Sequence, residues 1–341
     1  MYKSKPAFGF LIALTLSCFQ IAIYTTPGEA GQKTSNAEAV LWRNPVDIAS
    51  RDLFFGSGGR ENVPHGPFVF LDEDLDGTNP KFHVRDRDGV KWQVKLGIEA
   101  RPETAASRLV WAVGYPTTDY YFIPELRVEN MPAHLHRGQN LVAPDGTMRD
   151  VRLKRHTAEK KVGPWRWRSN PFVASREYNG LRVMMALINN WDLKYENNSI
   201  FREEDSEGLK SSEELYMVTD LGASFGSTGH SWPARKSKGN LESYSHSRFI
   251  RKITDDRVGF NIPTRPALLY LVAVPEFIRR LELRWIGKNI PRADAKWIGQ
   301  FLAMLSADQI RDAFRAAGYT TAEVEGFTQV VLKRIAALNG L

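Results

Sequence analysis

The chain has 341 residues, 43% of them hydrophobic and 25% charged, with a formal net charge of +7. This length is enough for one large domain or two joined lobes, and the composition is ordinary for a globular protein. The composition excludes a disordered chain or a coiled coil, and the single cysteine excludes a disulfide framework.

The N-terminus has the pattern of a secretory signal peptide. Two lysines near the start precede an apolar run over residues 8–23, and small residues follow up to Ala30. The pattern predicts a signal peptide over residues 1–30, cleaved after Ala30, with an uncleaved membrane anchor as the alternative. No later segment is long enough to span a bilayer, so we expect a secreted or periplasmic product with no stable membrane span.

The next part of the chain is predicted to be mainly β. A short strand at Phe68–Leu71 is followed by a polar loop, and two alternating runs around Asp88-Gly89 predict a hairpin over residues 81–96. A helix is expected from Pro102 to about Gly114, because proline suits a first helical turn and glycine suits a stop. Residues 120–128 then have the aromatic and β-branched content of a strand.

After about residue 131 the pattern becomes helical. The spacing of apolar residues predicts a long helix over roughly Ser175–Asn189 and a second one over Ser306–Ala316. A third helix is expected to be capped by Thr321 and to run to about Leu338. A mainly β first part and a mainly α second part indicate an α+β fold.

Two short motifs carry the chemistry. Asp192-Leu193-Lys194 comes just after the long predicted helix and is followed by Asn197, and Asp220-Leu221-Gly222 follows an apolar strand. Phosphoryl transfer needs a carboxylate near the attacking hydroxyl and oxygen ligands for Mg²⁺. Two aspartates and an asparagine in this order supply those groups. A surface loop in which these side chains cap turns is the alternative interpretation.

These residues resemble the protein-kinase-like superfamily, and their departures from its motifs resemble the atypical branch: HipA-type, secretory-pathway and phosphatidylinositol-type kinases, here as an exported, bacterial-type member. Asn190-Trp191 stands where protein kinases usually show His-Arg, and Leu221 replaces phenylalanine. The resemblance implies a bilobal, protein-kinase-like fold. After an N-terminal extension (31–60), a small mainly β N-lobe would cover residues 61–130 and a larger mainly α C-lobe residues 131–341.

The resemblance also implies ATP and Mg²⁺ as cofactors. Asp192 would orient the acceptor hydroxyl and accept its proton, while Lys194 would neutralise the transferring phosphoryl group. Asn197 and Asp220 would hold Mg²⁺.

The same fold needs a strand lysine that holds phosphates and is paired with a helix glutamate. Lys95, on the second hairpin strand, fits this position better than its rival Lys91. Glu103 is the expected partner, and Glu99, just before the predicted helix, is the alternative.

The loop that covers the phosphates would join the first two strands. Gly77, Thr78 and Asn79 occupy that place, although the loop lacks the Gly-x-Gly-x-x-Gly pattern. A glycine-rich stretch at residues 55–59 lies too early in the chain. The hinge between the lobes is expected near Glu125.

Three functions follow from these observations. The first is an ATP- and Mg²⁺-dependent phosphotransferase that acts on an unidentified hydroxyl acceptor, such as a protein, a lipid head group, a sugar or another small molecule. The alternative is a catalytically silent pseudokinase that binds a nucleotide or a partner. A third is a scaffold that holds anionic polymer on the basic clusters at residues 149–161 and 235–252. No nucleic-acid-binding signature accompanies these clusters, so no nucleic-acid partner is expected.

Overall fold

The structure, a computed structural model, describes residues 37–341 except 78, 158, 204–212, 228–236 and 263–281. The described residues belong to one unit, Ala37–Leu341. The predicted signal peptide lies outside the described residues. Among the helices of the described part of the chain, none has the length and apolar character to cross a membrane.

A six-stranded sheet forms the first lobe, with strand order β5-β7-β4-β3-β2-β6. Its strands are β2 (Phe68–Asp74), β3 (Lys81–Arg85), β4 (Lys91–Lys95), β5 (Tyr120–Leu126), β6 (Val128–Glu129) and β7 (Met148–Arg155). The β3–β4 hairpin predicted around Asp88-Gly89 is confirmed, and Gly89 has the positive φ of 82° that such a turn requires. Alternate residues such as Phe82, Val84 and Trp92 fill the core of the sheet.

The sheet extends beyond residue 130, where we expected the first lobe to end. Strand β7 pairs with both β4 and β5, so the chain returns to the sheet after a long excursion. The hinge predicted near Glu125 is wrong, because Glu125 pairs with Arg149 inside the sheet. The chain leaves the sheet only after Arg155 and then enters β8 (Glu159–Gly163).

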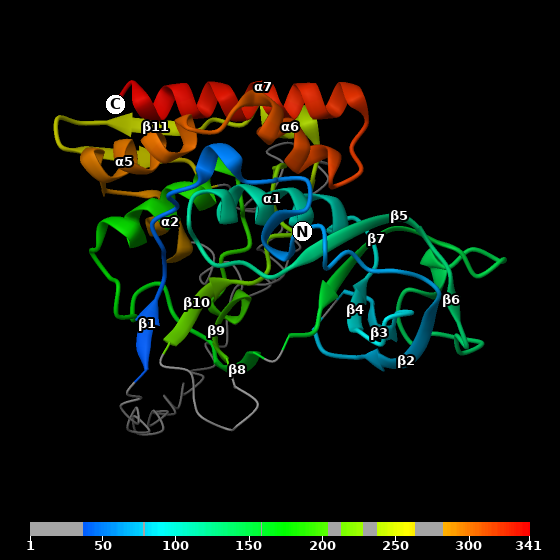
Figure 1. The fold of residues 1–341 in the computed structure, drawn as a ribbon. Helices are drawn as coiled ribbons and strands as arrows, with labels where there is room; N and C mark the ends of the chain where they lie inside the picture. Colours follow the sequence, from blue (N-terminus) through cyan, green and yellow to red (C-terminus); the bar gives the residue numbers. More distant parts are fainter. Residues whose placement is uncertain (1–36, 78, 158, 204–212, 228–236, 263–281) are drawn as a thin grey trace, which may run out of the picture. The chain divides into compact units, whose positions relative to one another are not determined.

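Helix α1 (Ala100–Ala112) connects the first lobe to the second. It follows β4 and packs against β5 and β7, and it also packs against α6 (Ala307–Arg315). Its apolar residues, including Leu109, belong to the large core of the helical lobe and not to the core of the sheet. In Figure 1, α1 lies between the six-stranded sheet and the C-terminal helices.

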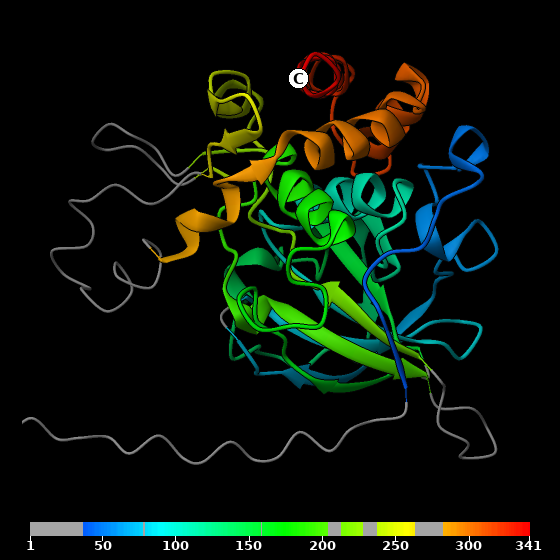
Figure 2. The same ribbon diagram turned by 90° about the vertical axis from the view of Figure 1, so that its left-hand side faces the viewer.

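The second lobe is mainly helical. Its longer helices are α2 (Arg176–Leu187), α5 (Arg292–Ala303), α6 and α7 (Thr321–Asn339), with a short α3 (Leu241–Ser245). Ser175 caps α2 and Ser306 caps α6 through their side chains, as those residue types favour. The cap of α7 is Thr320 and not Thr321, because the Thr320 side chain accepts a hydrogen bond from the Glu323 amide. Figure 2, with α7 seen end-on, shows the helices gathered on one side of the six-stranded sheet.

Two small sheets complete this lobe. The first has the order β1-β10-β9-β8, where β1 is Glu38–Val40, β9 is Asn198–Glu203 and β10 is Glu213–Val218. The second contains β11 (Ile250–Ile253), β12 (Arg257–Phe260) and β13 (Ile290–Pro291). Single 3₁₀ turns lie at Ile48–Ser50, Gly56–Gly58, Gln139–Leu141, Tyr195–Asn197 and Arg284–Gly287. The predicted fold class, an α+β protein with a mainly β lobe followed by a larger helical lobe, is confirmed.

Candidate functional site

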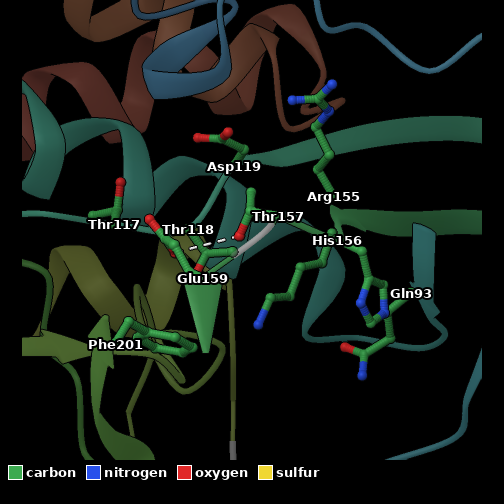
Figure 3. A pocket seen from close by; sticks show the side chains of 10 residues that line it. Gln93, Thr117, Thr118, Asp119, Arg155, His156, Thr157, Glu159 and Phe201 are labelled. Atoms are coloured by element: carbon green, nitrogen blue, oxygen red, sulfur yellow. Dashed lines mark hydrogen bonds between the residues drawn. The ribbon is translucent and has the colours of Figure 1, made fainter. Parts of the chain in front are cut away.

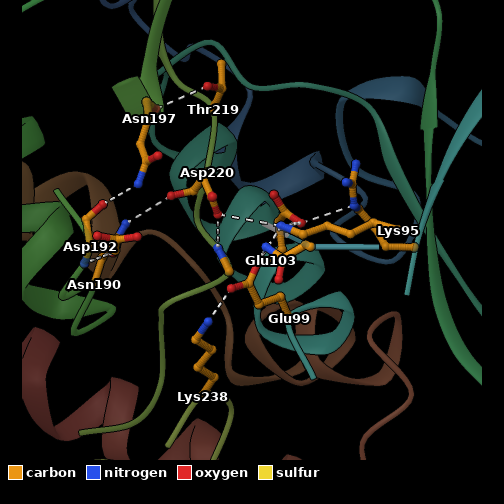
Figure 4. Close-up of polar contacts among 12 residues, drawn as sticks. Lys95, Glu99, Glu103, Asn190, Asp192, Asn197, Thr219, Asp220 and Lys238 are labelled. Atoms are coloured by element: carbon orange, nitrogen blue, oxygen red, sulfur yellow. Dashed lines mark hydrogen bonds and ion pairs between the residues drawn. The ribbon is translucent and has the colours of Figure 1, made fainter. Parts of the chain in front are cut away.

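Lys95 is the centre of a buried ionic cluster at the end of β4. Its Nζ lies 3.1 Å from Glu103 Oε2, 2.6 Å from Glu99 Oε2 and 3.7 Å from Asp220 Oδ1. Only 5% of the Lys95 side chain is exposed. Its rival Lys91 lies beside Asp72 and is 40% exposed. The geometry therefore favours Lys95 as the strand lysine and brings both candidate glutamates to it (Figure 4).

The charges in this cluster stabilise one another. Burial alone would lower the pKa of Lys95, but the carboxylates of Glu103, Asp220 and Glu99 outweigh this effect and the pKa is raised. Burial raises the pKa of Asp220 despite the attraction of Lys95, and the negative charges of Glu103 and Glu99 add to the rise. Glu103 is also paired with Arg152, whose Nε lies 3.1 Å from Glu103 Oε2. The cluster therefore keeps Lys95 charged.

Asp220 connects this cluster to the loop after α2. The amide of Thr219 donates to the carbonyl oxygen of Asn197 at 2.8 Å, and the Asp220 amide approaches the same oxygen at 3.4 Å. The carboxylate of Asp220 also accepts from the amide of Gly222 at 3.1 Å. The end of β10 thus places the main chain of Asp220 beside that of Asn197.

The loop after α2 is ordered by its own side chains. Asn197 Nδ2 donates to the carbonyl oxygen of Asp192 at 2.6 Å, and Lys194 Nζ lies 3.5 Å from Asp192 Oδ2. Asn190, which is fully buried, accepts from the Asp192 amide at 3.0 Å and donates to the carbonyl oxygen of Asp220 at 3.4 Å. Sequence reasoning assigned Asn190 no role of its own. In the structure its side chain bonds both Asp192 and Asp220 and so connects the two motifs.

The loop between β2 and β3 reaches the cluster through Asn79. The Nδ2 of Asn79 donates to Glu99 Oε2 at 2.7 Å. Gly77 has a φ of 67°, and its carbonyl oxygen accepts from Arg137. Thr78, the remaining residue predicted in this loop, lies outside the described residues. Of the described loop residues, the structure therefore brings Asn79 to the site, while Gly77 is held by a residue of the β6–β7 connection.

Two features of the site were not found by sequence reasoning. Lys238 Nζ forms an ion pair with Glu99 Oε1, and Arg152 supports Glu103 from the neighbouring strand. Lys238 lies in a basic stretch where no motif distinguishes it from its neighbours, and Arg152 lies in a strand that the sequence did not assign to the first lobe. Both contacts depend on how the chain folds back, which local patterns do not encode.

The residues present fit a magnesium–nucleotide pair. Because the Asn197 nitrogen is used by Asp192, its side-chain oxygen is the atom left for a cation. In the described part of the chain no cluster of three or more histidine, cysteine or acidic side chains forms a complete metal cage. Mg²⁺ takes one or two carboxylates from a protein and completes its shell with water and substrate phosphates.

A cavity of about 200 Å³ lies near this cluster, where the chain crosses to β8. Gln93 is among the residues that line it in Figure 3. Lys154 lines it as well, and Gln93 and Lys154 lie two residues from Lys95 and Arg152 on the same faces of β4 and β7. At 3.3 Å per residue, this spacing is about 7 Å. Burial, with a further contribution from Arg152, lowers the pKa of Lys154 to about 8. Phe201 of β9 forms another wall.

The chain is similar to two solved kinase structures. One is the Helicobacter pylori proinflammatory kinase CtkA, at 11% identity and a TM-score of 0.43, over 81% of this chain and 97% of that one. The other is a Rio2 kinase–ADP/Mg²⁺–phosphoaspartate complex from Chaetomium thermophilum, at 12% identity and a TM-score of 0.33, over 79% of this chain and 72% of that one. No protein-family model and no curated protein sequence matches the chain.

Proposed function

We propose that this chain is a phosphotransferase that uses ATP and Mg²⁺ to phosphorylate a hydroxyl acceptor. The observation that carries the proposal is the convergence on Asp220 of two groups distant in sequence. Lys95 lies 3.7 Å from its carboxylate on one side, and Asn197 and Asn190 bond its main chain on the other. A charged lysine, two hard oxygen ligands and a nearby carboxylate are the set that phosphoryl transfer requires.

Each residue has a role that follows from its position. Lys95, oriented by Glu103, would hold the α- and β-phosphates, and Asp220 with the side-chain oxygen of Asn197 would bind the metal ion. When bound, Mg²⁺ supplies charge neutralisation of the phosphate oxygens. Asp192 would orient the acceptor hydroxyl and take its proton, while Lys194, 3.5 Å from it, would offset charge on the transferring group.

The cavity beside Gln93 and Lys154 supports a place for the base of the nucleotide. It is lined by residues that lie two positions from Lys95 and Arg152 on the same strand faces, so it neighbours the proposed phosphate site. Phe201 offers an aromatic surface to a ring. The acceptor would then approach from the side of Asp192.

One observation favours the pseudokinase as a second candidate. Glu99 Oε2 lies 2.6 Å from Lys95 Nζ, closer than Glu103, so a phosphate would compete with two carboxylates for this lysine. A protein that keeps this arrangement permanently would bind partners and transfer no phosphate. The two functions therefore differ in turnover, not in the fold.

The deciding experiment measures nucleotide binding and phosphate transfer in parallel. Saturating ATP with Mg²⁺ at a hundred times its Kd is expected to stabilise the wild type by about 2.7 kcal/mol, and radiolabelled phosphate is expected to appear on an acceptor or in water. Asp220→Asn is expected to abolish the thermal shift that requires Mg²⁺. Asp192→Asn is expected to retain binding and to lower transfer by roughly 10²–10⁴-fold.

Asp255→Asn is the matched control, because Asp255 is an exposed carboxylate on the turn before β12. It is expected to leave binding and transfer unchanged. A wild-type shift without any transfer would favour the pseudokinase. The absence of a shift in the wild type would contradict the phosphotransferase, and full transfer by Asp192→Asn would remove that residue from its role.

The compartment and the acceptor belong to this proposal as well. The pattern of residues 1–30 supports export to the periplasm or the medium, which N-terminal sequencing of the mature protein would test by finding Gly31 first. Incubation with radiolabelled ATP and separate protein, lipid and small-molecule fractions would identify the acceptor class.

A further inference from the structure

Glu99 is held by three donors that come from three separate segments. Lys95 Nζ contacts Oε2 at 2.6 Å from β4, Asn79 Nδ2 donates to the same oxygen at 2.7 Å from the β2–β3 loop, and Lys238 Nζ pairs with Oε1. The Glu99 side chain is 8% exposed. Two cations and an amide arranged about one carboxylate are the chemistry of an anion-binding site, and the carboxylate is its present occupant.

Lys238 is placed by main-chain hydrogen bonds. Its neighbour Ser237 donates to the carbonyl oxygen of Ser227 at 2.9 Å, and Gly239 donates to that of Ser224 at 2.9 Å. These bonds join Lys238 to the segment that directly follows Asp220-Leu221-Gly222. The ammonium group also lies 5.4 Å from the ring of Trp191, next to Asp192. The main-chain bonds on both sides of Lys238 therefore hold it where its side chain meets Glu99.

Glu99 lies tightly against the Asp220 motif. A Cβ atom on Gly222 would lie 2.8 Å from Glu99 Cβ, which is too close for any residue other than glycine. The Glu99 carboxylate therefore lies between Lys95 and the turn after Asp220. A phosphate bound by Lys95 and by a metal ion on Asp220 would need this same space.

The charges also favour an exchange of anions. In the described cluster, Lys95, Arg152 and Lys238 balance Glu99, Glu103 and Asp220. A magnesium–nucleoside triphosphate adds net negative charge, which buried sites tolerate only when it is compensated. If the Glu99 side chain moved away, the site would carry one negative charge less. Lys95, Asn79 and Lys238 would then be free to bind the nucleotide.

We infer that the Glu99 carboxylate stands in for a nucleotide phosphate, and that Lys238 and Asn79 bind that phosphate when it displaces Glu99. The inference rests on the nucleotide site proposed above and adds to it a phosphate-binding lysine and an intramolecular competitor. Glu99 thus lowers the affinity for the nucleotide by competing with its phosphate, while Glu103 stays paired with Lys95 whether or not the nucleotide is bound.

The test compares binding of Mg²⁺–ADP, adenosine and inorganic tripolyphosphate by calorimetry. Glu99→Gln is expected to bind Mg²⁺–ADP and tripolyphosphate at least 10-fold more tightly than the wild type, because the competing charge is gone. Glu99→Asp, whose shorter side chain reaches Lys95 less well, serves as a second variant in case the glutamine variant does not fold. Glu103→Gln is expected to bind more weakly than the wild type.

Lys238→Met tests the new phosphate contact. It is expected to reduce the preference for ADP over adenosine by at least 10-fold. The control is Lys288→Met, which replaces an exposed lysine before β13 and is expected to leave that preference unchanged. Unchanged or weaker phosphate binding by both Glu99 variants would overturn the inference, as would an unchanged preference in Lys238→Met. Tighter tripolyphosphate binding without any phosphate transfer would support it while the phosphotransferase proposal fails.

Discussion

The pairing of Glu99 with two lysines ties the stability of the fold to pH. Burial alone would raise the pKa of Glu99, but Lys95 and Lys238 outweigh it and hold that pKa well below its usual value of 4.5. A carboxyl whose pKa is lower in the folded state stabilises the protein when it is ionised. That contribution is fully present above about pH 4.5 and is lost as pH falls through the lowered pKa.

Glu99→Gln is therefore expected to cost about 2 kcal/mol of unfolding free energy at pH 7, the scale of a charged hydrogen bond. The difference from the wild type is expected to shrink as pH falls below about 4.5. Urea unfolding monitored by circular dichroism between pH 2.5 and 7 measures both curves, with Glu125→Gln as an exposed control. A difference that stays constant down to pH 2.5 would contradict the ion pairs.

The site residues that sequence could predict are those held in short motifs. Asp192, Asn197 and Asp220 are identified by spacing, and Lys95 by its place on a hairpin strand. The partner Lys238 is separated from Glu99 by 139 residues, so no local pattern connects them. Glu99 itself was visible as a rival of Glu103, but the sequence could not show that both reach Lys95.

At the scale of elements, α1 is shared by the two lobes. It carries Glu103 toward Lys95, while its apolar face, with Leu109 fully buried, lies in the core of the helical lobe. Its position is therefore set both by β5 and β7 of the first sheet and by α6 near the C-terminus.

Leu109→Ala is expected to destabilise the protein by about 2–5 kcal/mol, because the fully buried side chain leaves a cavity that the packed helices cannot fill. The loss is expected to lower the affinity for Mg²⁺–ADP as well, since α1 positions Glu103. Chemical unfolding and calorimetry measure the two effects. Ile98→Ala, at a side chain that is 70% exposed just before α1, is the control and is expected to change neither.

The elements that escaped sequence analysis share a physical cause. The β6–β7 excursion inserts a loop into the first sheet, so the predicted hinge near Glu125 falls inside a strand. The caps of α6 and α7 follow local side-chain chemistry, and Thr320 caps α7 in preference to Thr321 because Glu323, three residues later, completes a capping box with it. Hairpins and capped helices are local, whereas lobe boundaries depend on long-range strand pairing.

At the scale of the whole molecule, one buried arginine joins the C-terminal helix to the site-bearing part of the helical lobe. Arg334 of α7 is 4% exposed, and its guanidinium donates to the carbonyl oxygens of Leu187 at 2.8 Å and of Tyr244 at 3.2 Å. It also lies 4.0 Å from the centre of the Tyr244 ring. Because α2 leads directly into the loop with Asn190 and Asp192, α7 supports the position of that loop.

Arg334→Met is expected to destabilise the protein by about 3 kcal/mol, because it removes the buried hydrogen bonds of a charged guanidinium while keeping much of the side-chain volume. Lys333→Met, the exposed neighbour on the same helix, is expected to change stability by less than about 0.5 kcal/mol. Urea unfolding of both variants gives the comparison. Equal stability of the two would show that α7 packs on α2 through its apolar face alone, with no contribution from the arginine.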